Sequence, residues 1–291
     1  MEYIASLVVL MGIYVILSSS FNLIIGYGGL MSIAHPLFFA FGAYTTGLAA
    51  IHADLNPLIA VLLGGIVATG MSFMISVPSL RISGDYLLIT SIGFQLGGLE
   101  VIKNLDFVGG ASGLSNIPNV VSGPARSFVF AAVACGTAAA IVMLVRWLVN
   151  GPYGLAIQAM RDDELAFAAA GRSPLNVKLS IFAIGSGLSG VAGGIYAYYF
   201  QYLTPEQFAI LESATILTMV VVGGMGSVMG PVVGSVLLLA LPQAITFLDF
   251  PTSVMAPLQG LIYSSLVLVF LFLRPQGLVG GRAREGERKH A

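Results

Sequence analysis

Long apolar segments are the feature that most limits how this chain can fold. Only 9% of the 291 residues are charged, against about 25% in soluble domains. A helix that crosses a bilayer needs about 20 mostly apolar residues, and the sequence contains nine candidates. They lie approximately at 3–25, 31–51, 57–77, 85–103, 128–149, 179–202, 210–226, 229–248 and 254–273. Glycine and proline interrupt several of them, so counts of eight to ten spans all fit.

The continuous apolar character of these segments indicates helices rather than a membrane barrel. Backbone polar groups must be paired within lipid, which leaves only helices and closed barrels, and barrel strands alternate apolar and polar residues. The sequence therefore predicts an all-α polytopic membrane protein, about nine helices with several breaks. Glu2 stands where a cleavable signal peptide carries positive charge, so we expect the first apolar stretch to be retained as a helix.

The distribution of basic residues predicts the orientation of the chain, because cytoplasmic loops are enriched in Lys and Arg. With nine spans and the N-terminus outside, ten of the twelve basic residues fall on the inner side. These are Arg81, Arg146, Arg161, Arg172, Lys178, Arg274, Arg282, Arg284, Arg288 and Lys289. The outer side keeps Lys103 and Arg126, beside the acidic residues Glu2, Asp54, Asp106, Glu206, Glu212 and Asp249. The basic tail, residues 279–291, is expected to be a cytoplasmic topology anchor.

Two polar segments interrupt an otherwise single transmembrane domain, residues 1–278. Residues 104–127 are expected to form an outer loop, and residues 150–178 the longest inner loop. Neither is large enough for a nucleotide-binding domain, and no G-x-x-x-x-G-K-[ST] sequence occurs, so we do not expect this chain to hydrolyse ATP. Cys135 is the one cysteine and stands in no metal-ligand cluster, so no metal or cofactor is expected.

A short pattern rich in glycine occurs twice. Residues 28–36, GGLMSIAHP, and residues 223–231, GGMGSVMGP, both read G-G-x-x-S-x-x-x-P and begin 195 positions apart. The sequence around the first copy differs from a potassium-channel filter, which needs TVGYG after a short pore helix. Glycine allows positive φ, proline removes a helical hydrogen bond and serine can satisfy a freed backbone group. We therefore expect a break between helices at each copy.

Two interpretations of these breaks stay open. Internal repeats are common in transporters, and the breaks would then shape a translocation path. Small residues also allow tight helix packing, which needs no path. The candidate path residues are Gly28, Gly29, Ser32, His35, Pro36, Gly223, Gly224, Ser227 and Pro231. His35 either faces that path or is a hydrogen-bonded structural histidine.

The inner loop contains a segment with the composition of a short helix in water. Pro152 precedes this segment, Gly171 suits its C-cap and Pro174 stops its continuation. Four consecutive residues form a compact charged patch: Arg161, Asp162, Asp163 and Glu164. The segment is either a solvated loop or a helix that docks in a groove on a cytosolic partner.

Charges within the spans are few. Arg81 and Asp85 lie near an inner boundary, and Glu100 and Lys103 near an outer one, at spacings that allow each pair to form an ion pair. No span carries an unpaired central charge, which a proton- or sodium-coupled carrier often has. This pattern favours a transporter whose energy is supplied by another component rather than by a coupled ion, and whose substrate is a small amphiphile rather than an ion.

Five blocks of sequence cover nearly the whole chain. In chain order they are FNLIIGYGGLMSIAHPLFFAFGAY, LRISGDYLLITSIGFQ, GLAIQAMRDDELAFAAAGRSPLNVKLSIFAIGSGLSGVAGGIYAYYFQYLTP, TILTMVVVGGMGSVMGPVVGSVLLLALP and FLFLRPQGLVGG. Together they resemble the permease subunits of bacterial ABC importers for branched-chain, or hydrophobic, amino acids. The resemblance implies a non-catalytic subunit of the bacterial inner (plasma) membrane. Its implied partners are a second, different permease, two cytosolic ATPase subunits and a periplasmic binding protein.

In that family the inner loop docks on an ATPase subunit and couples ATP hydrolysis to transport. The resemblance carries this role onto Arg161, Asp162, Asp163, Glu164 and Gly171. The general importer pattern E-A-A-x-x-x-G is not met strictly, because Leu165 stands six residues before Gly171 and Glu164 one further back. Polar groups of the outer loops would face the binding protein: Asn104, Asp106, Ser112, Asn116, Glu206 and Gln207.

Other functions remain alternatives at this point. Permeases for urea or short-chain amides look alike, so the substrate of the importer stays open within this class of machine. A stand-alone secondary carrier is the alternative from another class, and it would work without an ATPase. The repeated breaks disfavour a purely structural membrane protein.

Overall fold

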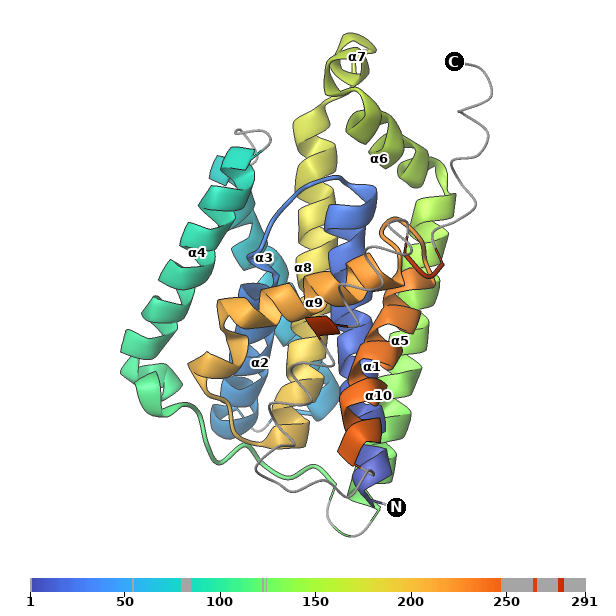
Figure 1. Cartoon of the computed structure of the whole chain (residues 1–291). Helices are drawn as coiled ribbons and strands as arrows, with labels where there is room; N and C mark the ends of the chain where they lie inside the picture. Colours follow the sequence, from blue (N-terminus) through green and yellow to red (C-terminus); the bar gives the residue numbers. More distant parts are fainter. Residues whose placement is uncertain are drawn as a thin grey trace.

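Helices make up the regular structure of the part of the chain that the computed structural model describes (Figure 1). The structure describes residues 2–53, 55–79, 85–121, 123, 125–246, 264–265 and 277–279. Five helices there are long and apolar enough to cross a membrane: Glu2–Tyr27, Pro57–Met74, Arg126–Asn150, Pro174–Phe200 and Pro205–Gly223. The expected polytopic helical membrane protein is therefore confirmed, whereas the count of nine spans and the orientation stay predictions.

Eight of the nine expected spans coincide with helices. They are α1 (Glu2–Asn22), α2 (His35–His52), α3 (Pro57–Ser79), α4 (Asp85–Asn104), α5 (Arg126–Asn150), α8 (Pro174–Phe200), α9 (Ile210–Gly223) and α10 (Gly230–Thr246). The ninth, 254–273, lies outside the described residues except for 264–265. The inner loop forms α6 (Pro152–Asp162) and α7 (Glu164–Ala169). Short helical turns complete the order: η1 (Leu23–Tyr27), η2 (Asp106–Val108), η3 (Gly110–Ser112) and η4 (Pro205–Phe208).

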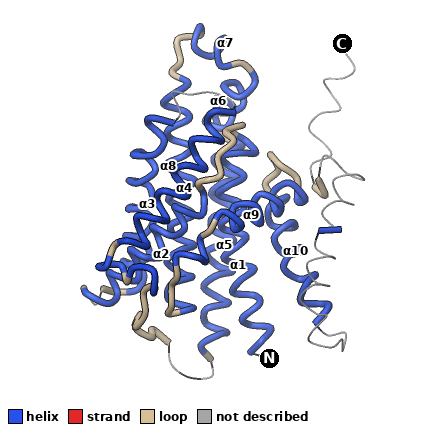
Figure 2. The backbone as a smooth tube through the Cα atoms, turned by 60° about the vertical axis from the view of Figure 1, so that its left-hand side comes forward, coloured by secondary structure: helices blue, strands red, loops and turns tan. Residues whose placement is uncertain are grey.

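The long helices form one bundle, in which α8 packs along α2 and α3 while α1 packs against α5 (Figures 1 and 2). A side chain at Gly42 of α2 would collide with the backbone of Gly190 of α8. Lipid supplies no hydrophobic force between helices, so close van der Waals contact through such small residues holds them together. In contrast, the axis of α9 is strongly tilted relative to the other long helices and crosses the bundle in both views.

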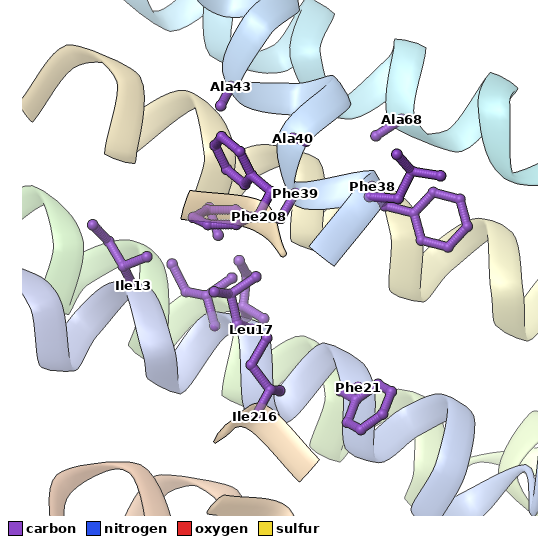
Figure 3. Close-up of a cluster of buried hydrophobic side chains, with 14 of the residues drawn as sticks. Ile13, Leu17, Phe21, Phe38, Phe39, Ala40, Ala43, Ala68, Phe208 and Ile216 are labelled. Carbon is purple, nitrogen blue, oxygen red and sulfur yellow. The ribbon is translucent and has the colours of Figure 1, made fainter. Parts of the chain in front are cut away.

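Large buried side chains anchor this crossing helix (Figure 3). Phe39 of α2 meets Phe208 of η4 edge to face with ring centroids 5.0 Å apart, and it meets Tyr196 of α8 at 5.3 Å. Ile216 of α9 lies beside Leu17 of α1, and both are fully buried. The ring of Phe208 also lies 6.1 Å from that of Tyr196, so the segment η4–α9 contacts α1, α2 and α8.

Loop contacts close the end of the bundle that holds the N-terminus. Leu114 and Leu203 form a two-way backbone bridge, with N···O distances of 2.8 and 3.0 Å. The guanidinium of Arg126 donates to the carbonyl of Tyr199 at 2.6 Å, near the end of α8. Helices α6 and α7 project from the opposite end (Figure 1). The two expected loops thus lie at opposite ends of the molecule.

The structure changes two expectations about local detail. The helix expected at 31–51 begins only at His35, because Gly29 adopts φ 65° and the following residues leave the helical path. The expected ion pair between Glu100 and Lys103 is not found among the described residues. Instead the Asn104 amide, one helical turn from Glu100, donates to the carboxylate at 3.2 Å. Arg81 of the other expected pair lies outside the described residues.

Candidate functional site

The first glycine pattern lies in a true interruption between two helices. The last turn of the first span is the π-helix η1, and residues 29–34 are not helical before α2 begins at His35 with Pro36 in its first turn. Leu30 N–H, which would bond the Gly26 carbonyl in an α-helix, donates to the Ile24 carbonyl at 3.1 Å instead. π-Helical turns are frequent at functional sites.

Side chains from two other helices satisfy the backbone that this break frees. The Ile33 N–H donates to Ser91 Oγ of α4 at 2.9 Å, and Ser213 Oγ of α9 donates to the Ile33 carbonyl at 2.7 Å. The Leu37 N–H donates to Gln95 Oε1 at 3.0 Å, and the amide group of Gln95 donates to the Phe208 carbonyl at 2.7 Å. Buried backbone groups without partners are costly in lipid, so these four hydrogen bonds fix the shape of the break.

His35 and Ser32 lie inside this first break. His35 is 1% exposed, and its Nε2 lies 2.9 Å from Ser20 Oγ. Its Nδ1 is buried with no hydrogen-bond partner in the described part of the chain. Ser32 is also buried and accepts weakly from the Ala34 N–H at 3.4 Å. Both residues are positioned within the protein rather than at its surface.

The second glycine pattern forms a comparable break between α9 and α10. The helix ends at Gly223, and Gly224 takes φ 118°. Ser227 Oγ accepts from the Gly230 N–H at 2.9 Å and donates to the Gly224 carbonyl at 2.9 Å. It therefore supplies an acceptor for the N–H of Gly230, the first residue of α10, in whose first turn Pro231 lies.

A short C-terminal segment completes this second break. The Leu278 N–H donates to the Val222 carbonyl at 3.0 Å, and the Val279 N–H donates to the Gly223 carbonyl at 3.1 Å. Carbonyls in the last turn of a helix have no partner within that helix. Residues 277–279 supply those partners from another part of the chain.

The two breaks meet in space, which their distance in the sequence did not indicate. The Asn22 amide donates to the Ser227 carbonyl at 2.9 Å, while its Oδ1 accepts from the Gly226 N–H at 2.9 Å. A Cβ at Gly26 would lie only 2.7 Å from the Gly226 nitrogen. Asn22 therefore joins the end of the first span to the second break, and Ser18 adds a 2.6 Å contact with Ser235 of α10.

The inner loop is two helices rather than the one expected. Asp163 adopts extended backbone angles, and its Oδ1 accepts from the Ala166 N–H at 2.9 Å, so it ends α6 and caps α7. Gly171 follows the C-cap of α7 with φ 78°, a conformation that favours glycine. The sequence did not indicate this cap, because an Asp within a run of charged residues looks the same whether or not it caps a helix.

The four consecutive charges of this loop lie in different surroundings. Glu164 forms an ion pair with Lys178, whose Nζ lies 2.7 Å from both carboxylate oxygens. The guanidinium of Arg161 donates to the Gly26 carbonyl at 2.5 Å. Asp162 is exposed. The expected compact patch is thus divided between the bundle and solvent.

Two apolar side chains of the loop project away from the bundle. Leu155 of α6 is 69% exposed and Leu165 of α7 is 84% exposed. On the other face of α6, Ile157 is buried and Tyr153 bonds Ser180 of α8 at 2.5 Å. Burial raises the pKa of the Tyr153 hydroxyl above its usual value, although the bond to Ser180 acts in the opposite direction. The loop is therefore fixed on one side and offers leucine on the other.

Some residues of this site went unnoticed in the sequence. Asn22, Ser91, Gln95 and Ser213 are polar residues within apolar spans, and that location is the signal that could have identified them. Among the described residues, no three His, Cys, Asp or Glu side chains gather into a metal site. The contacts described at the two breaks are hydrogen bonds among backbone groups, neutral side chains and the guanidinium of Arg161.

Comparisons with known proteins follow the same length of chain. The family model for the branched-chain amino acid transport system / permease component matches residues 3–273. The high-affinity branched-chain amino acid transport system permease protein LivM of Salmonella typhimurium is 31% identical over 294 residues, covering 92% of this chain and 68% of the relative. LivM of Escherichia coli is 30% identical with the same coverage.

A more distant relative comes from an archaeon. The probable branched-chain amino acid transport permease protein LivM of Methanocaldococcus jannaschii is 27% identical over 323 residues, covering 96% of this chain and 93% of the relative. No solved structure matches this chain.

Proposed function

This chain belongs to the family of branched-chain amino acid transport permease components, and from that premise we propose that it is a permease subunit of an ATP-driven ABC importer. It forms part of the path by which branched-chain or other hydrophobic amino acids cross the inner (plasma) membrane. The observation that carries the proposal is the family match, which extends over residues 3–273. Apart from Glu2 at the start of α1, all of the helices described above fall within that range, as do both glycine patterns, whereas residues 277–279 lie beyond it.

The polar interior of the two breaks supports a path at this place. Their candidate lining residues are Gly28, Gly29, Ser32, His35, Pro36, Gly223, Gly224, Ser227 and Pro231. An amino acid carries polar backbone groups, and irregular backbone at membrane depth is tolerated where it is buried in protein or lines a cavity. Transporter sites are commonly built at broken helices of repeated segments. The unpartnered Nδ1 of His35 adds one buried polar group to this region.

The α6–α7 loop is the proposed docking element for an ATPase subunit. It comprises the residues expected from the sequence, Arg161, Asp162, Asp163, Glu164 and Gly171. Its exposed Leu155 and Leu165 would enter a groove on the partner, as small apolar anchors do in helix-in-groove recognition. The full machine would contain two ATPase subunits, a second, different permease and a periplasmic binding protein docked on the outer loops. Residues 1–278 form one permease domain, and the basic tail 279–291 lies in the cytoplasm.

Purification and uptake test this function together. We would tag the chain, purify it in mild detergent and identify the associated subunits by mass spectrometry. The complex would then be placed in liposomes with the binding protein and ATP, and supplied with labelled leucine, valine or urea. ATP-dependent leucine uptake supports the proposal. Uptake of urea alone would favour the amide alternative, and uptake by the isolated chain without ATP would favour a secondary carrier.

A further inference from the structure

Arg161 is the one charge of the α6–α7 loop that reaches into the breaks. We propose that Arg161 is a positioning residue that transmits movement of the α6–α7 loop to both helix breaks through the Gly26 carbonyl and Asn22. The proposal rests on the proposed function of this loop as the docking element for an ATPase. It divides the loop into an outward part that binds the partner and an inward residue that acts on the path.

The carbonyl that Arg161 bonds is one that the backbone leaves free. Leu30, its partner in a regular α-helix, donates to Ile24 because η1 is a π-helical turn. Arg161 Nη1 supplies a donor for Gly26 at 2.5 Å. Charged donors near the end of a helix stabilise its last carbonyls. Arg161 therefore supplies the donor that the π-helical turn leaves the Gly26 carbonyl without.

The aliphatic part of Arg161 lies across a glycine of the first pattern. A Cβ at Gly29 would lie 2.9 Å from Arg161 Cγ and 3.3 Å from Cδ. The same guanidinium lies near the second break, since Nη1 is 4.0 Å from where a Cβ of Gly226 would be. The side chain thus occupies the junction between the two breaks, and the glycines leave room for it.

The contact continues beyond Arg161 through Asn22. Asn22 lies one turn before Gly26, and its side-chain amide accepts from the Gly226 N–H and donates to the Ser227 carbonyl. Displacing the Gly26 carbonyl therefore moves residues that directly contact the second break. Arg161 as a whole stays exposed, so its bond to Gly26 can open without leaving a buried, unpaired charge. Such a contact can be made and broken in each transport cycle.

The test measures coupling in the complete importer, reconstituted with its ATPases, second permease and binding protein. Arg161→Met removes the donor but keeps most of the stem, and Arg161→Lys restores one charged donor. Arg172→Met is the matched control, because Arg172 is an exposed arginine of the same loop. The readout is the number of ATP molecules hydrolysed per leucine taken up, alongside the yield of assembled complex.

We expect Arg161→Met to raise the ATP cost per leucine at least about fivefold, the lower end of typical coupling factors between sites. The ATP cost per leucine of Arg161→Lys should lie between those of this variant and the wild type, and the cost of Arg172→Met should equal that of the wild type. A merely structural role would lower the yield of complex and leave the ratio unchanged. Equal ratios for Arg161→Met and Arg172→Met would overturn the proposal. A wild-type complex that takes up no leucine would instead overturn the proposed function, and this inference with it.

A double-mutant cycle keeps the proposal testable if Arg161→Met assembles poorly. Asn22→Ser shortens the second link of the chain, and Arg161→Lys serves as the milder change of the first. Residues of one hydrogen-bonded network show non-additive effects, so we expect the double variant to have nearly the same ratio as the worse single variant. Multiplying effects would show that Arg161 and Asn22 act independently and would refute the transmission.

Discussion

The ion pair between Glu164 and Lys178 makes a quantitative prediction about the attachment of α7. The Lys178 side chain is 8% exposed and bonds both oxygens of Glu164 at 2.7 Å, while the Glu164 side chain is 46% exposed. Breaking a fully buried pair by removing one partner costs about 3–5 kcal/mol. Because solvent reaches Glu164, we expect Glu164→Gln to cost less, about 1–2 kcal/mol of local stability.

The opposite change should be milder. Lys178→Met removes the buried charge itself and leaves behind a carboxylate that water can solvate, so we expect a cost of about 0–1 kcal/mol. Each ~1.4 kcal/mol changes an equilibrium about tenfold. The open form of the loop should therefore be populated about tenfold more in Glu164→Gln than in the wild type, and only a few times more in Lys178→Met.

Trypsin cleavage after Arg172 measures this opening, because cleavage of a folded segment follows the population of its open form when reclosing is fast. The complex would be digested in membrane vesicles that expose the loop, and cleavage would be followed by mass spectrometry. Asp162→Asn is the matched control, since Asp162 is a neighbouring exposed acid. Equal cleavage rates for Glu164→Gln and Asp162→Asn would refute the reasoning, as would faster cleavage of Lys178→Met than of Glu164→Gln.

Three further predictions concern packing, hydrogen bonding and docking. Gly42→Val should destabilise the bundle by at least about 1–3 kcal/mol, because its side chain would meet the backbone of Gly190. The fraction of the protein that elutes as a single monodisperse peak in size-exclusion chromatography should therefore fall. Gly93→Ala is the control and should behave as wild type, because a Cβ at Gly93 meets nothing within 4 Å. Ser227→Ala removes the acceptor for the Gly230 N–H and should lower the free energy of unfolding by about 1 kcal/mol, so an unchanged midpoint in a detergent denaturation series would contradict a stabilising role of this bond. Leu165→Ser should leave the membrane level of the chain unchanged and lower the affinity for the ATPase about tenfold, as expected for an apolar anchor; undiminished recovery of the ATPase would exclude Leu165 from the interface.

The sequence predicted the features that depend on local composition. Spans follow from runs of apolar residues, so α1, α3, α5 and α8 lie close to their expected positions. The breaks were also predicted, because glycine allows backbone angles outside the helix and proline lacks the N–H that would continue one. The end of the first span extended further than expected, since its last turn widens to a π-helix rather than stopping.

Contacts between distant segments could not be predicted in the same way. No local pattern indicates that Asn22 would bond Ser227, or that Arg161 would turn toward Gly26 rather than toward solvent. Hydropathy also gives a helix's length but not its tilt, which neighbouring helices set. The tilt of α9 across the bundle is for this reason a property of packing, through Phe208 of the preceding η4 against Phe39 and through Ile216 of α9 beside Leu17 (Figures 1 and 3). Because a translocation path is likewise formed by contacts between distant segments, the role of the candidate path residues is a proposal.

The bonds from Leu278 and Val279 to the end of α9 have a consequence for how the protein is made. The carbonyls of Val222 and Gly223 receive these partners only after residues 277–279 have been synthesised. A nascent chain with α9 already inserted still lacks the two hydrogen bonds that complete the second break. Premature termination before residue 277 would leave the carbonyls of Val222 and Gly223 without these two hydrogen-bond donors. Fusion partners for expression are accordingly best joined beyond residue 279.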